Sequence, residues 1–342
     1  MGSKTSIEWT RGDDGSAGAT WNPIRARNLA TGKIGWHCEH VSEGCRNCYS
    51  ESMNRRLGTG LDFKPGHRAD VEIFLDEKML LAPLRWKKPR RIFVNSMTDT
   101  FAEFVKDEWI DRMFAVMALA PQHTFQVLTK RPGRMQTYCC DPQSQRIWRL
   151  ACNMGQPGRA LSATLAKFGS PWPLPNVWLG VSAEDQATFE ERRQSLRDTP
   201  AAVRFFSLEP LLGPIDVGPA LVTGCYHWTI VGGESGPHAR PMHPQWCRDI
   251  RDQCAAAGVP FFLKQWGEWL PGESNNGQFD AERMMHAYRR CDNHSYEWPN
   301  TSRVQNFGTH PDPWSGGLTA RRVGKRAAGR LLDGRTHDGM PI

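Results

Sequence analysis

Short runs rich in β-branched and aromatic residues alternate with longer amphipathic stretches through the middle of this chain. The runs cover residues 91–95, 124–129, 176–181, 203–207, 228–233 and 259–264. The amphipathic stretches, which repeat apolar residues at the spacing of one helix face, cover residues 107–120, 185–197 and 245–257. Strands that alternate with helices indicate βα units and a parallel sheet. The number of units exceeds an open Rossmann half, so the pattern predicts an α/β fold with a partial or complete (β/α) TIM-like barrel.

The segment before this series predicts three short elements. Ile7–Trp9 and Thr20–Pro23 have the composition of short strands, separated by a loop rich in Gly, Asp and Ser. Tyr49–Leu57 predicts a short amphipathic helix that ends at Gly58.

Two regions interrupt the alternating pattern. Residues 139–175 hold a Cys-Cys pair with several glycines and prolines, which indicates an insertion. Residues 271–342 begin with a stretch rich in Gly, Asn, Pro and His and end in a basic tail. We therefore expect a barrel over residues 1–270 that contains the insertion, followed by an irregular extension whose tail packs on the barrel.

Each predicted strand of the series ends in polar residues. These ends are Asn95-Ser96, Thr129-Lys130, Ser182-Ala183-Glu184, Ser207-Leu208-Glu209, Gly233-Glu234-Ser235 and Lys264-Gln265. In barrels the active site is built just beyond the carboxyl ends of the strands. The pattern therefore predicts one shared functional face.

Three cysteines lie close together ahead of the βα series. Cys38, Cys45 and Cys48 are spaced Cys-x6-Cys-x2-Cys. A structural zinc site normally needs a fourth protein ligand, and a [4Fe–4S] cluster usually takes four thiolates. The spacing therefore indicates either a cluster with one iron left open or a zinc ion completed by His37, His40 or a distant residue.

The other cysteines show no second cluster spacing. Cys247 and Cys254 are seven residues apart on one helix face and are expected in the core. A second metal at Cys139, Cys140 and Cys152 is left open.

Charge and composition indicate which kind of binding partner suits this chain. The net charge is +7, with basic runs at 86–91 and 321–326, and the chain has 14 tryptophans. Basic and aromatic residues together suit a nucleic acid, although each run also fits an ordinary solvated face. No apolar run approaches the length of a membrane span, and the first residues do not form a signal peptide. We expect a cytoplasmic protein with reduced cysteines and no membrane partner.

Several motifs support a resemblance that covers most of the chain. They are Thr5–Thr10, Thr20–Pro23, Val41–Tyr49, Ile92–Asp99, Gln126–Pro132, Ser207–Pro214, Val231–Gly236, Lys264–Gly267 and Lys325–Arg330. With them the chain resembles a phage- and bacterium-encoded family of uncharacterised proteins with a three-cysteine motif. It resembles more distantly the radical S-adenosylmethionine enzymes, such as spore photoproduct lyase.

This resemblance implies a [4Fe–4S] cluster held by Cys38, Cys45 and Cys48, with S-adenosyl-L-methionine on the open iron. Reductive cleavage of S-adenosylmethionine would leave a 5′-deoxyadenosyl radical that abstracts hydrogen from the substrate, while the protein supplies position and a closed site. It also implies a protein that reduces the cluster, and leaves open a genomically linked protein partner.

The chain departs from the common radical-enzyme pattern in its first cysteine spacing, which usually has three residues where this chain has six. Asn47 stands where an aromatic residue usually precedes the last cysteine, with Tyr49 one place beyond that cysteine. Gly232-Gly233-Glu234 comes too late in the chain for the usual Gly-Gly-Glu role, which is not carried onto Glu234. By position, the candidates for binding the cofactor are Tyr49, Asn95, Ser96, Ser182, Glu184 and Glu209. Ordinary hydrogen-bonded strand ends are the alternative for several of them.

The cations expected on the same face are candidates for substrate binding. With the glutamate of the glycine-rich turn, the set is Lys130, Arg131, Glu234, Arg240 and Lys264. Such cations suit a phosphate backbone, but salt bridges to glutamates of the same face are an equal alternative.

The leading hypothesis is a radical S-adenosylmethionine enzyme that modifies or repairs a base of a nucleic acid or nucleotide, as a lyase or a transferase. The alternative is a zinc-stabilised, non-catalytic nucleic-acid-binding protein. A third possibility is a cluster-bearing protein that no longer cleaves S-adenosylmethionine.

Overall fold

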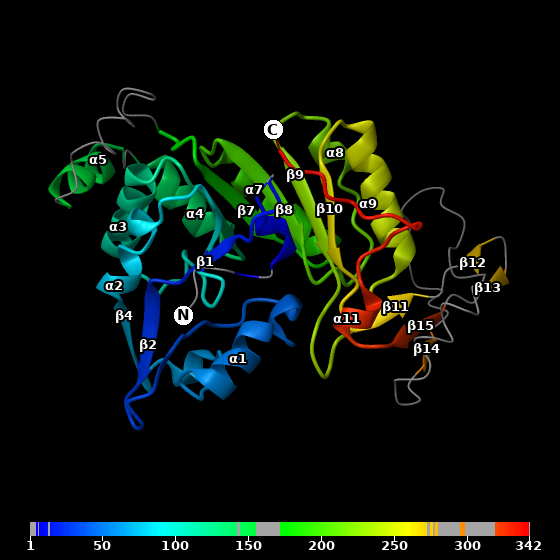
Figure 1. The fold of residues 1–342 in the computed structure, drawn as a ribbon, viewed down its shortest axis with the longest axis horizontal. Helices are drawn as coiled ribbons and strands as arrows, with labels where there is room; N and C mark the ends of the chain where they lie inside the picture. Colours follow the sequence, from blue (N-terminus) through cyan, green and yellow to red (C-terminus); the bar gives the residue numbers. More distant parts are fainter. Residues whose placement is uncertain are drawn as a thin grey trace.

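The computed structural model describes residues 5, 7–12, 14–141, 144–154, 172–271, 274–275, 278–279, 295–297 and 319–341. Its main feature is a seven-stranded parallel sheet (Figure 1). In order across the sheet the strands are β1 (Ala19–Trp21), β5 (Arg91–Val94), β6 (Thr124–Thr129), β7 (Val177–Ser182), β8 (Val203–Leu208), β9 (Trp228–Gly232) and β10 (Phe261–Gln265). From β5 to β10 each strand pairs with the preceding strand of this sheet, as in a (β/α) barrel. Among the described residues β1 and β10 are the two edges, so the predicted partial barrel is confirmed as a half-barrel.

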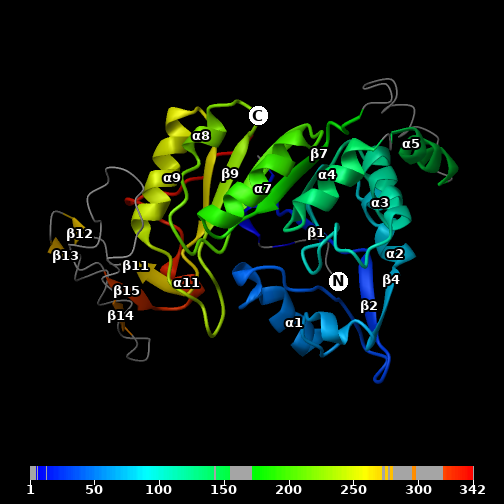
Figure 2. The same ribbon diagram turned by 180° about the vertical axis from the view of Figure 1, so that it is seen from behind.

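Helices cover the outer face of this sheet, as Figure 2 shows from behind. The longer helices are α1 (Tyr49–Leu57), α3 (Asp107–Leu119), α4 (Pro132–Cys140), α5 (Ser144–Asn153), α7 (Gln186–Asp198) and α9 (Pro244–Ala256). The short helices are α2 (Glu77–Leu80), α8 (Gly218–Leu221) and α11 (Lys325–Ala328), with 3-10 turns η1 (Glu8–Thr10), η2 (Glu43–Cys45), η3 (Pro65–His67) and η4 (Pro83–Arg85). Helix α1 does not join this layer, because it lies below the sheet in Figure 1 together with the cysteine segment, and α11 packs beside β11.

The strands alternate between two hydrophobic cores. In β5, Ile92 and Val94 pack in the large core beneath the helices, whereas Phe93 packs on the concave side. The same alternation places Phe206 outward and Phe205 inward in β8. Successive side chains of a strand point to opposite faces, so each strand contributes to both cores.

The concave side is filled by an aromatic cluster around Trp9. The Trp9 ring lies 4.7 Å from Phe93, 6.1 Å from Phe205 and 6.0 Å from Trp228, measured between ring centroids. The prediction of a strand over Ile7–Trp9 is wrong, because Glu8–Thr10 form the 3-10 turn η1. This turn lets Trp9, which is 2% exposed, enter the barrel interior instead of joining a sheet edge.

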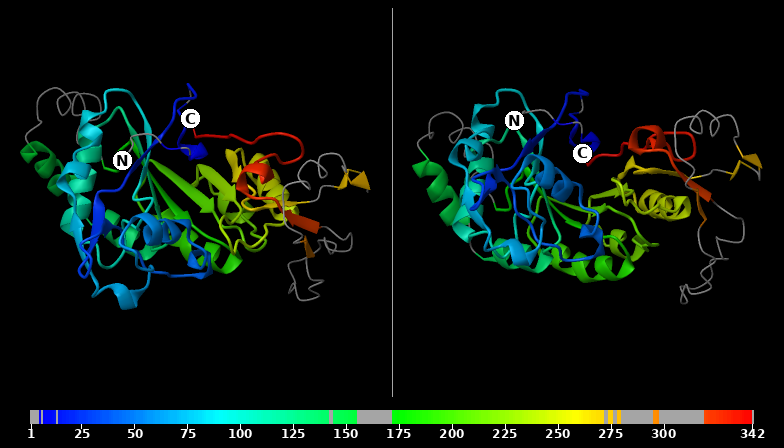
Figure 3. Two further views of the ribbon diagram at one scale, coloured as in Figure 1. Left: turned by 60° about the horizontal axis from the view of Figure 1, so that its bottom comes forward. Right: turned by 90° about the horizontal axis from the view of Figure 1, so that it is seen from below.

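The carboxyl-terminal segment packs along the free edge of β10. Phe262 and Asp338 form an antiparallel bridge, and the Leu263 amide donates to the His337 carbonyl. The Trp228 indole donates to the Gly339 carbonyl at 2.7 Å. In Figure 3 this segment (red) runs next to the amino-terminal segment that carries η1 (dark blue). Together the two segments cover the open side of the half-barrel.

Three smaller sheets complete the described structure. The strands β3 (Ile34–Gly35), β2 (Ile24–Asn28) and β4 (Val71–Leu75) form one; β11 (Trp269–Pro271), β15 (Thr319–Arg322) and β14 (Ser295–Glu297) form the second; β12 (Ser274–Asn275) and β13 (Gln278–Phe279) form the third. Of the expected insertion at 139–175, residues 142–143 and 155–171 lie outside the described residues. Helix α5 packs against α3. None of the helices in the described ranges is long and apolar enough to span a membrane.

Candidate functional site

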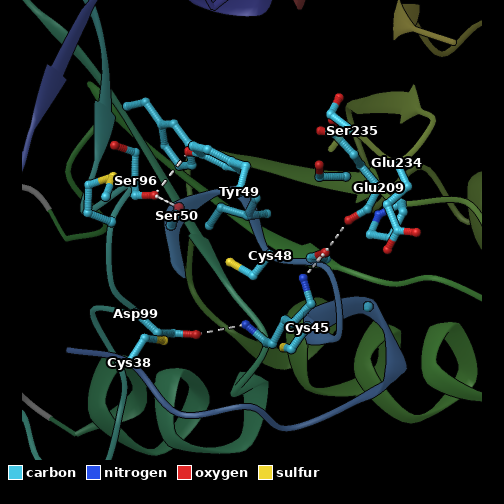
Figure 4. A pocket seen from close by; sticks show the side chains of 18 of the residues that line it. Cys38, Cys45, Cys48, Tyr49, Ser50, Ser96, Asp99, Glu209, Glu234 and Ser235 are labelled. Carbon is cyan, nitrogen blue, oxygen red and sulfur yellow. Dashed lines mark hydrogen bonds between the residues drawn. The ribbon is translucent and has the colours of Figure 1, made fainter. Parts of the chain in front are cut away.

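The cysteine segment lies over the carboxyl ends of the strands and forms one wall of a pocket of about 460 Å³. Cys38, Cys45 and Cys48 all line this pocket, and Figure 4 shows their side chains around it. The opposite wall is formed by residues at, or just beyond, the carboxyl ends of β5 to β10. Trp9, together with Phe93, contributes to the apolar part of the lining. The polar strand ends predicted to share one face therefore do meet at one pocket.

The three thiols differ in their surroundings. Cys38 and Cys48 pack against the small cluster of Trp36, Phe63 and Met97. Burial, followed by the nearby Asp99 carboxylate, raises the pKa of Cys38 to about 12, against the opposing charge of Arg131. Burial also raises the pKa of Cys48. In the free protein both groups are therefore protonated at neutral pH, and a metal would have to displace these protons.

The possible metal ligands in the pocket lining are the three thiols and carboxylates that include Glu39 and Asp99. All three cysteines are free thiols, and among the described residues that line the pocket there is no histidine. The His37 ring instead faces Glu39, with Nε2 at 3.3 Å from Oε1, and His40 lies 3.3 Å from Glu51. Among the described residues, no three His, Cys, Asp or Glu side chains lie close enough together to hold one metal ion.

The first anchor of the cysteine segment comes from the loops after β5 and β6. Arg131 donates from Nη2 to the Glu39 carbonyl at 3.1 Å, next to Cys38, and from Nη1 to Asp99 at 3.3 Å. Asp99 also accepts from the Thr129 hydroxyl at 2.7 Å. Arg131 is 8% exposed and Asp99 is 7% exposed, so this pair is part of the packed wall.

A second anchor holds the segment between Glu43 and Asn47. The Gly44 amide donates to Glu184 Oε1 at 3.2 Å. Glu184 in turn accepts from Arg192 Nη1 at 3.1 Å, and neither side chain is more than 3% exposed. This buried pair ties the turn that carries Cys45 to the end of β7.

A third anchor joins the segment to the loop after β9. Arg240 donates to both carboxylate oxygens of Glu234, at 2.7 and 3.0 Å, and to the carbonyl of Glu43 at 2.9 Å. Asn47 donates to Glu234 at 2.9 Å. Burial disfavours the charged Glu234 carboxylate, but the hydrogen bonds from Arg240 and Asn47 outweigh this effect and lower its pKa.

The start of α1 is fixed on the loop after β5. The hydroxyls of Tyr49 and Ser50 both donate to the Ser96 carbonyl, at 3.1 and 2.9 Å (Figure 4). The predicted cofactor residue Asn95 directs its amide toward Thr100 at 3.0 Å and Met113 at 3.8 Å. Asn95 has a φ of 50°, and its buried Oδ1 has no hydrogen-bond partner among the described residues.

Polar side chains at the carboxyl ends of the strands line the pocket and form hydrogen bonds with one another. Lys130 Nζ donates to the Ser182 hydroxyl at 2.8 Å, and Ser182 donates to the Glu209 carbonyl at 3.1 Å. Lys264 Nζ and Gln265 Nε2 bind the Glu209 carboxylate at 2.8 and 3.0 Å. Burial opposes the charge on Lys264, but Glu209 outweighs it and raises the pKa of this ammonium.

The predicted site residues therefore separate into two groups. Those that line the pocket are Cys38, Cys45, Cys48, Tyr49, Asn95, Ser96, Lys130, Arg131, Ser182, Glu209, Glu234 and Lys264. Glu184 and Arg240 lie behind its wall, where each anchors the cysteine segment. For Arg131, Glu234, Arg240 and Lys264 the structure shows the ion pairs that were the alternative to free substrate-binding charges.

Sequence reasoning assigned no role to Asp99 or to the Asn47 side chain. Asp99 lies in the loop after β5, three residues beyond Ser96, so its position is a usable signal. Asn47 was noted only because it is not aromatic, and its bond to Glu234 joins positions 187 residues apart.

The two basic runs do not share one face. Lys325 lines the pocket, whereas residues 86–91 lead into the amino end of β5. The amino ends of parallel strands lie at the opposite edge of the sheet from the carboxyl ends. The run at 86–91 therefore lies away from the pocket.

The cysteines outside the segment form no second cluster within the described ranges. Cys139 is buried, while Cys140 and Cys152 are exposed. Cys247 and Cys254 belong to the large core, as predicted, and burial raises the pKa of both thiols. Cys291 lies outside the described residues.

Comparison with known proteins gives one match. Neither the curated proteins nor the solved structures contain a match to this chain. One family model, described as "Protein of unknown function (DUF5131)", matches residues 4–341. Because this match covers nearly the whole length, the chain belongs to the DUF5131 family.

Proposed function

We propose that this protein is a radical S-adenosylmethionine enzyme of the partial (β/α)-barrel type, with a [4Fe–4S] cluster on Cys38, Cys45 and Cys48. The observation that carries the proposal is the meeting of these three thiols at one pocket, at the carboxyl ends of a parallel half-barrel. When bound, such a cluster supplies the electron that cleaves S-adenosylmethionine to a 5′-deoxyadenosyl radical. Three thiols without a pocket histidine fit a cluster with one open iron.

The residues around the pocket would hold the cluster-binding cysteines in place for this chemistry. Arg131, Glu184 and Arg240 hold the cysteine segment against the strand ends. Lys130, which donates to the neutral Ser182 hydroxyl, brings a positive charge to a pocket that would receive a negatively charged thiolate cluster and the carboxylate of S-adenosylmethionine.

The barrel side of the pocket is apolar, which suits radical chemistry. Trp9, Phe93 and Leu128 line it on the side of the barrel interior. These apolar groups exclude water from that side, and their packing against the aromatic cluster keeps the lining rigid. The hydrogen-bonded polar side chains around Glu209 provide hydrogen-bond partners at fixed positions for the polar end of a cofactor.

A nucleic acid or nucleotide is the substrate that we propose, with modification or repair of a base as the reaction. The pocket volume of about 460 Å³ is in the range of small-molecule and cofactor sites. A protein donor that reduces the cluster is part of the same proposal. The nine cysteines that are free thiols among the described residues agree with a cytoplasmic, reducing compartment.

Reductive cleavage is the direct test. The anaerobically reconstituted protein is reduced with dithionite in the presence of S-adenosylmethionine, and 5′-deoxyadenosine and methionine are quantified. We expect both products from the wild type and neither from Cys45→Ala, while Cys254→Ala matches the wild type. A protein that carries the cluster but forms no 5′-deoxyadenosine would contradict the proposed reaction and leave the cluster-bearing, non-cleaving alternative.

A further inference from the structure

A second cavity of about 350 Å³ adjoins the cysteine pocket. It lies between the exposed side of α1 and the loop that follows β9, from Ser235 to His238. Asn47, Cys48, Tyr49 and Ser235 line both cavities. The two spaces therefore share a wall, and we call the second one the α1 groove.

Positive charge predominates along the α1 groove. Its lining includes Arg46, Arg55 and Arg56, and the acid among the described lining residues is Glu51. Glu51 is 3% exposed and is already bound, because it accepts from the Phe63 amide at 2.9 Å and lies near His40 and Arg55. The groove thus presents a net positive surface to solvent.

The arginines differ in how far they are engaged. Arg55 pairs with Asp62 at 3.1 Å, and Arg46 stands 3.8 Å from Glu43 with a side chain that is 70% exposed. Arg56 forms no ion pair with any described residue. Arg46 and Arg56 are therefore the cations best placed to meet an external anion.

Exposed apolar groups lie among these charges. Tyr49 is 46% exposed and Met53, one helical turn further along α1, is 37% exposed. Tyr49 stands at the wall common to both cavities. Aromatic faces next to cations form the arrangement that binds single-stranded nucleic acid, where bases stack and phosphates pair.

We propose that the α1 groove binds the backbone of a single-stranded nucleic acid segment whose target base enters the cysteine pocket. The inference rests on the proposed function, since it assigns a polymer rather than a free nucleotide as substrate. Charge complementarity and the wall shared with the pocket favour this occupant. An acidic electron-carrier protein is the competing partner, and the experiment below distinguishes the two.

The test compares two charge-matched double variants of the full-length, cluster-loaded protein. Arg46→Glu/Arg56→Glu changes the groove, and Lys87→Glu/Lys88→Glu changes the basic run at the opposite edge of the sheet by the same net charge. Fluorescence anisotropy measures binding of fluorescein-labelled single-stranded DNA and RNA of about 12 nucleotides, within the site sizes of known single-strand binders. Titrations over a series of salt concentrations give the slope of log K against log salt.

We expect the groove variant to bind on the order of tenfold more weakly at low salt. Its salt slope should fall by about 1.4, because each phosphate contact to a single strand contributes about 0.7. The Lys87→Glu/Lys88→Glu variant should keep the wild-type slope. Equal effects of the two double variants, or an unchanged groove variant, would overturn the assignment of the groove.

Two further outcomes separate this inference from the function on which it rests. Cluster content and 5′-deoxyadenosine formation are measured on the same samples. Wild-type protein that forms 5′-deoxyadenosine but binds no oligonucleotide would overturn the groove assignment and leave the radical chemistry standing. A groove variant that keeps oligonucleotide binding but is reduced more slowly by an acidic flavoprotein, and normally by dithionite, would identify a protein-docking surface and overturn the inference.

Discussion

At the scale of single residues, the Glu184–Arg192 pair shows how a buried charge can serve a site that it does not line. The two side chains are 0% and 3% exposed, and Arg192 also donates to the Ser182 carbonyl at 2.7 Å. Removing one partner of such a pair leaves the other charge buried without compensation. Glu184 is also the acceptor for the Gly44 amide, so the pair couples the stability of β7 to the position of the cysteine segment.

Glu184→Gln should therefore lower the free energy of unfolding by about 3–5 kcal/mol, because the amide keeps the shape but not the charge that Arg192 requires. Denaturant unfolding of the metal-free protein measures this change. Glu190→Gln, in the helix α7 that carries Arg192, is the matched control, because its partner Arg193 is partly exposed and the pair contributes less than about 1 kcal/mol. A Glu184→Gln protein as stable as the control would contradict the account.

His243 makes the stability of the fold depend on pH in the acid range. It is fully buried and accepts a hydrogen bond from the Gln245 amide at the start of α9, at 3.0 Å. Burial, with a smaller effect of Arg248, lowers its pKa from 6.5 to about 4. The unfolded chain therefore binds a proton at a higher pH than the folded chain does.

The contribution of His243 to stability should be complete above about pH 6.5 and should be lost as the pH falls toward 4, by about 3 kcal/mol in total. His243→Asn should remove this part of the acid dependence, since asparagine can cap the helix but does not titrate. His243→Ala should remove it as well but lower stability at every pH through loss of the cap. Unfolding curves across this pH range measure both effects, and an unchanged acid slope in both variants would refute the assignment.

At the scale of elements, the cysteine segment is an irregular loop whose position is set by contacts distant in sequence. Among the residues that anchor this segment, Arg240 makes the most hydrogen bonds. Its planar guanidinium donates to Glu234 and to Glu43. A lysine supplies the charge but not the fork of donors. The anchor is therefore expected to depend on the shape of the side chain as well as on its charge.

Arg240→Lys should accordingly load a cluster but release iron several-fold faster when a chelator is added. The rate of iron loss followed by absorbance measures the effect. Arg248→Lys is the matched control, because Arg248 makes a similar pair with Asp333 away from the pocket. Equal rates of iron loss from the two variants would show that the anchor does not hold the site.

The regular elements of the half-barrel could be predicted from sequence, and the contacts of the loop could not. The predicted bounds of strand β6 match the observed ones, and those of α3 differ by one residue. Such elements are predictable because the spacing of apolar residues along the sequence indicates which faces are buried. The turn η1 was missed because the apolar Trp9 fills the barrel instead of pairing in a sheet. The bonds of Asn47 and Arg240 depend on tertiary folding, which brings remote positions together and leaves no local pattern.

At the scale of the whole molecule, the half-barrel is filled by aromatic side chains. Gly180 in β7 faces this interior, where an added Cβ would stand 2.5 Å from the ring of Phe205. Phe205 in turn packs against Trp9 and Trp228. The glycine is thus required by the packing of the two rings and not by its backbone angles.

Gly180→Ala should lower the free energy of unfolding by about 1–3 kcal/mol, the usual cost of overpacking a core. Gly133→Ala is the matched control, because its Cβ would meet nothing within 4 Å and it lies in the first turn of α4. That change should be neutral or stabilising by up to about 1 kcal/mol. Thermal unfolding of the two variants measures the difference, and a Gly180→Ala protein as stable as Gly133→Ala would contradict the filled interior.

The central claim is the proposed iron–sulfur cluster on the three cysteines, and analysis of iron, acid-labile sulfide and zinc in anaerobically purified protein tests it most directly. The account predicts a brown protein with about four irons and four sulfides per chain. Cys45→Ala should lose both, and Cys254→Ala should keep both. A colourless wild-type protein with zinc and no sulfide, or with no metal after reconstitution with iron and sulfide, would contradict it.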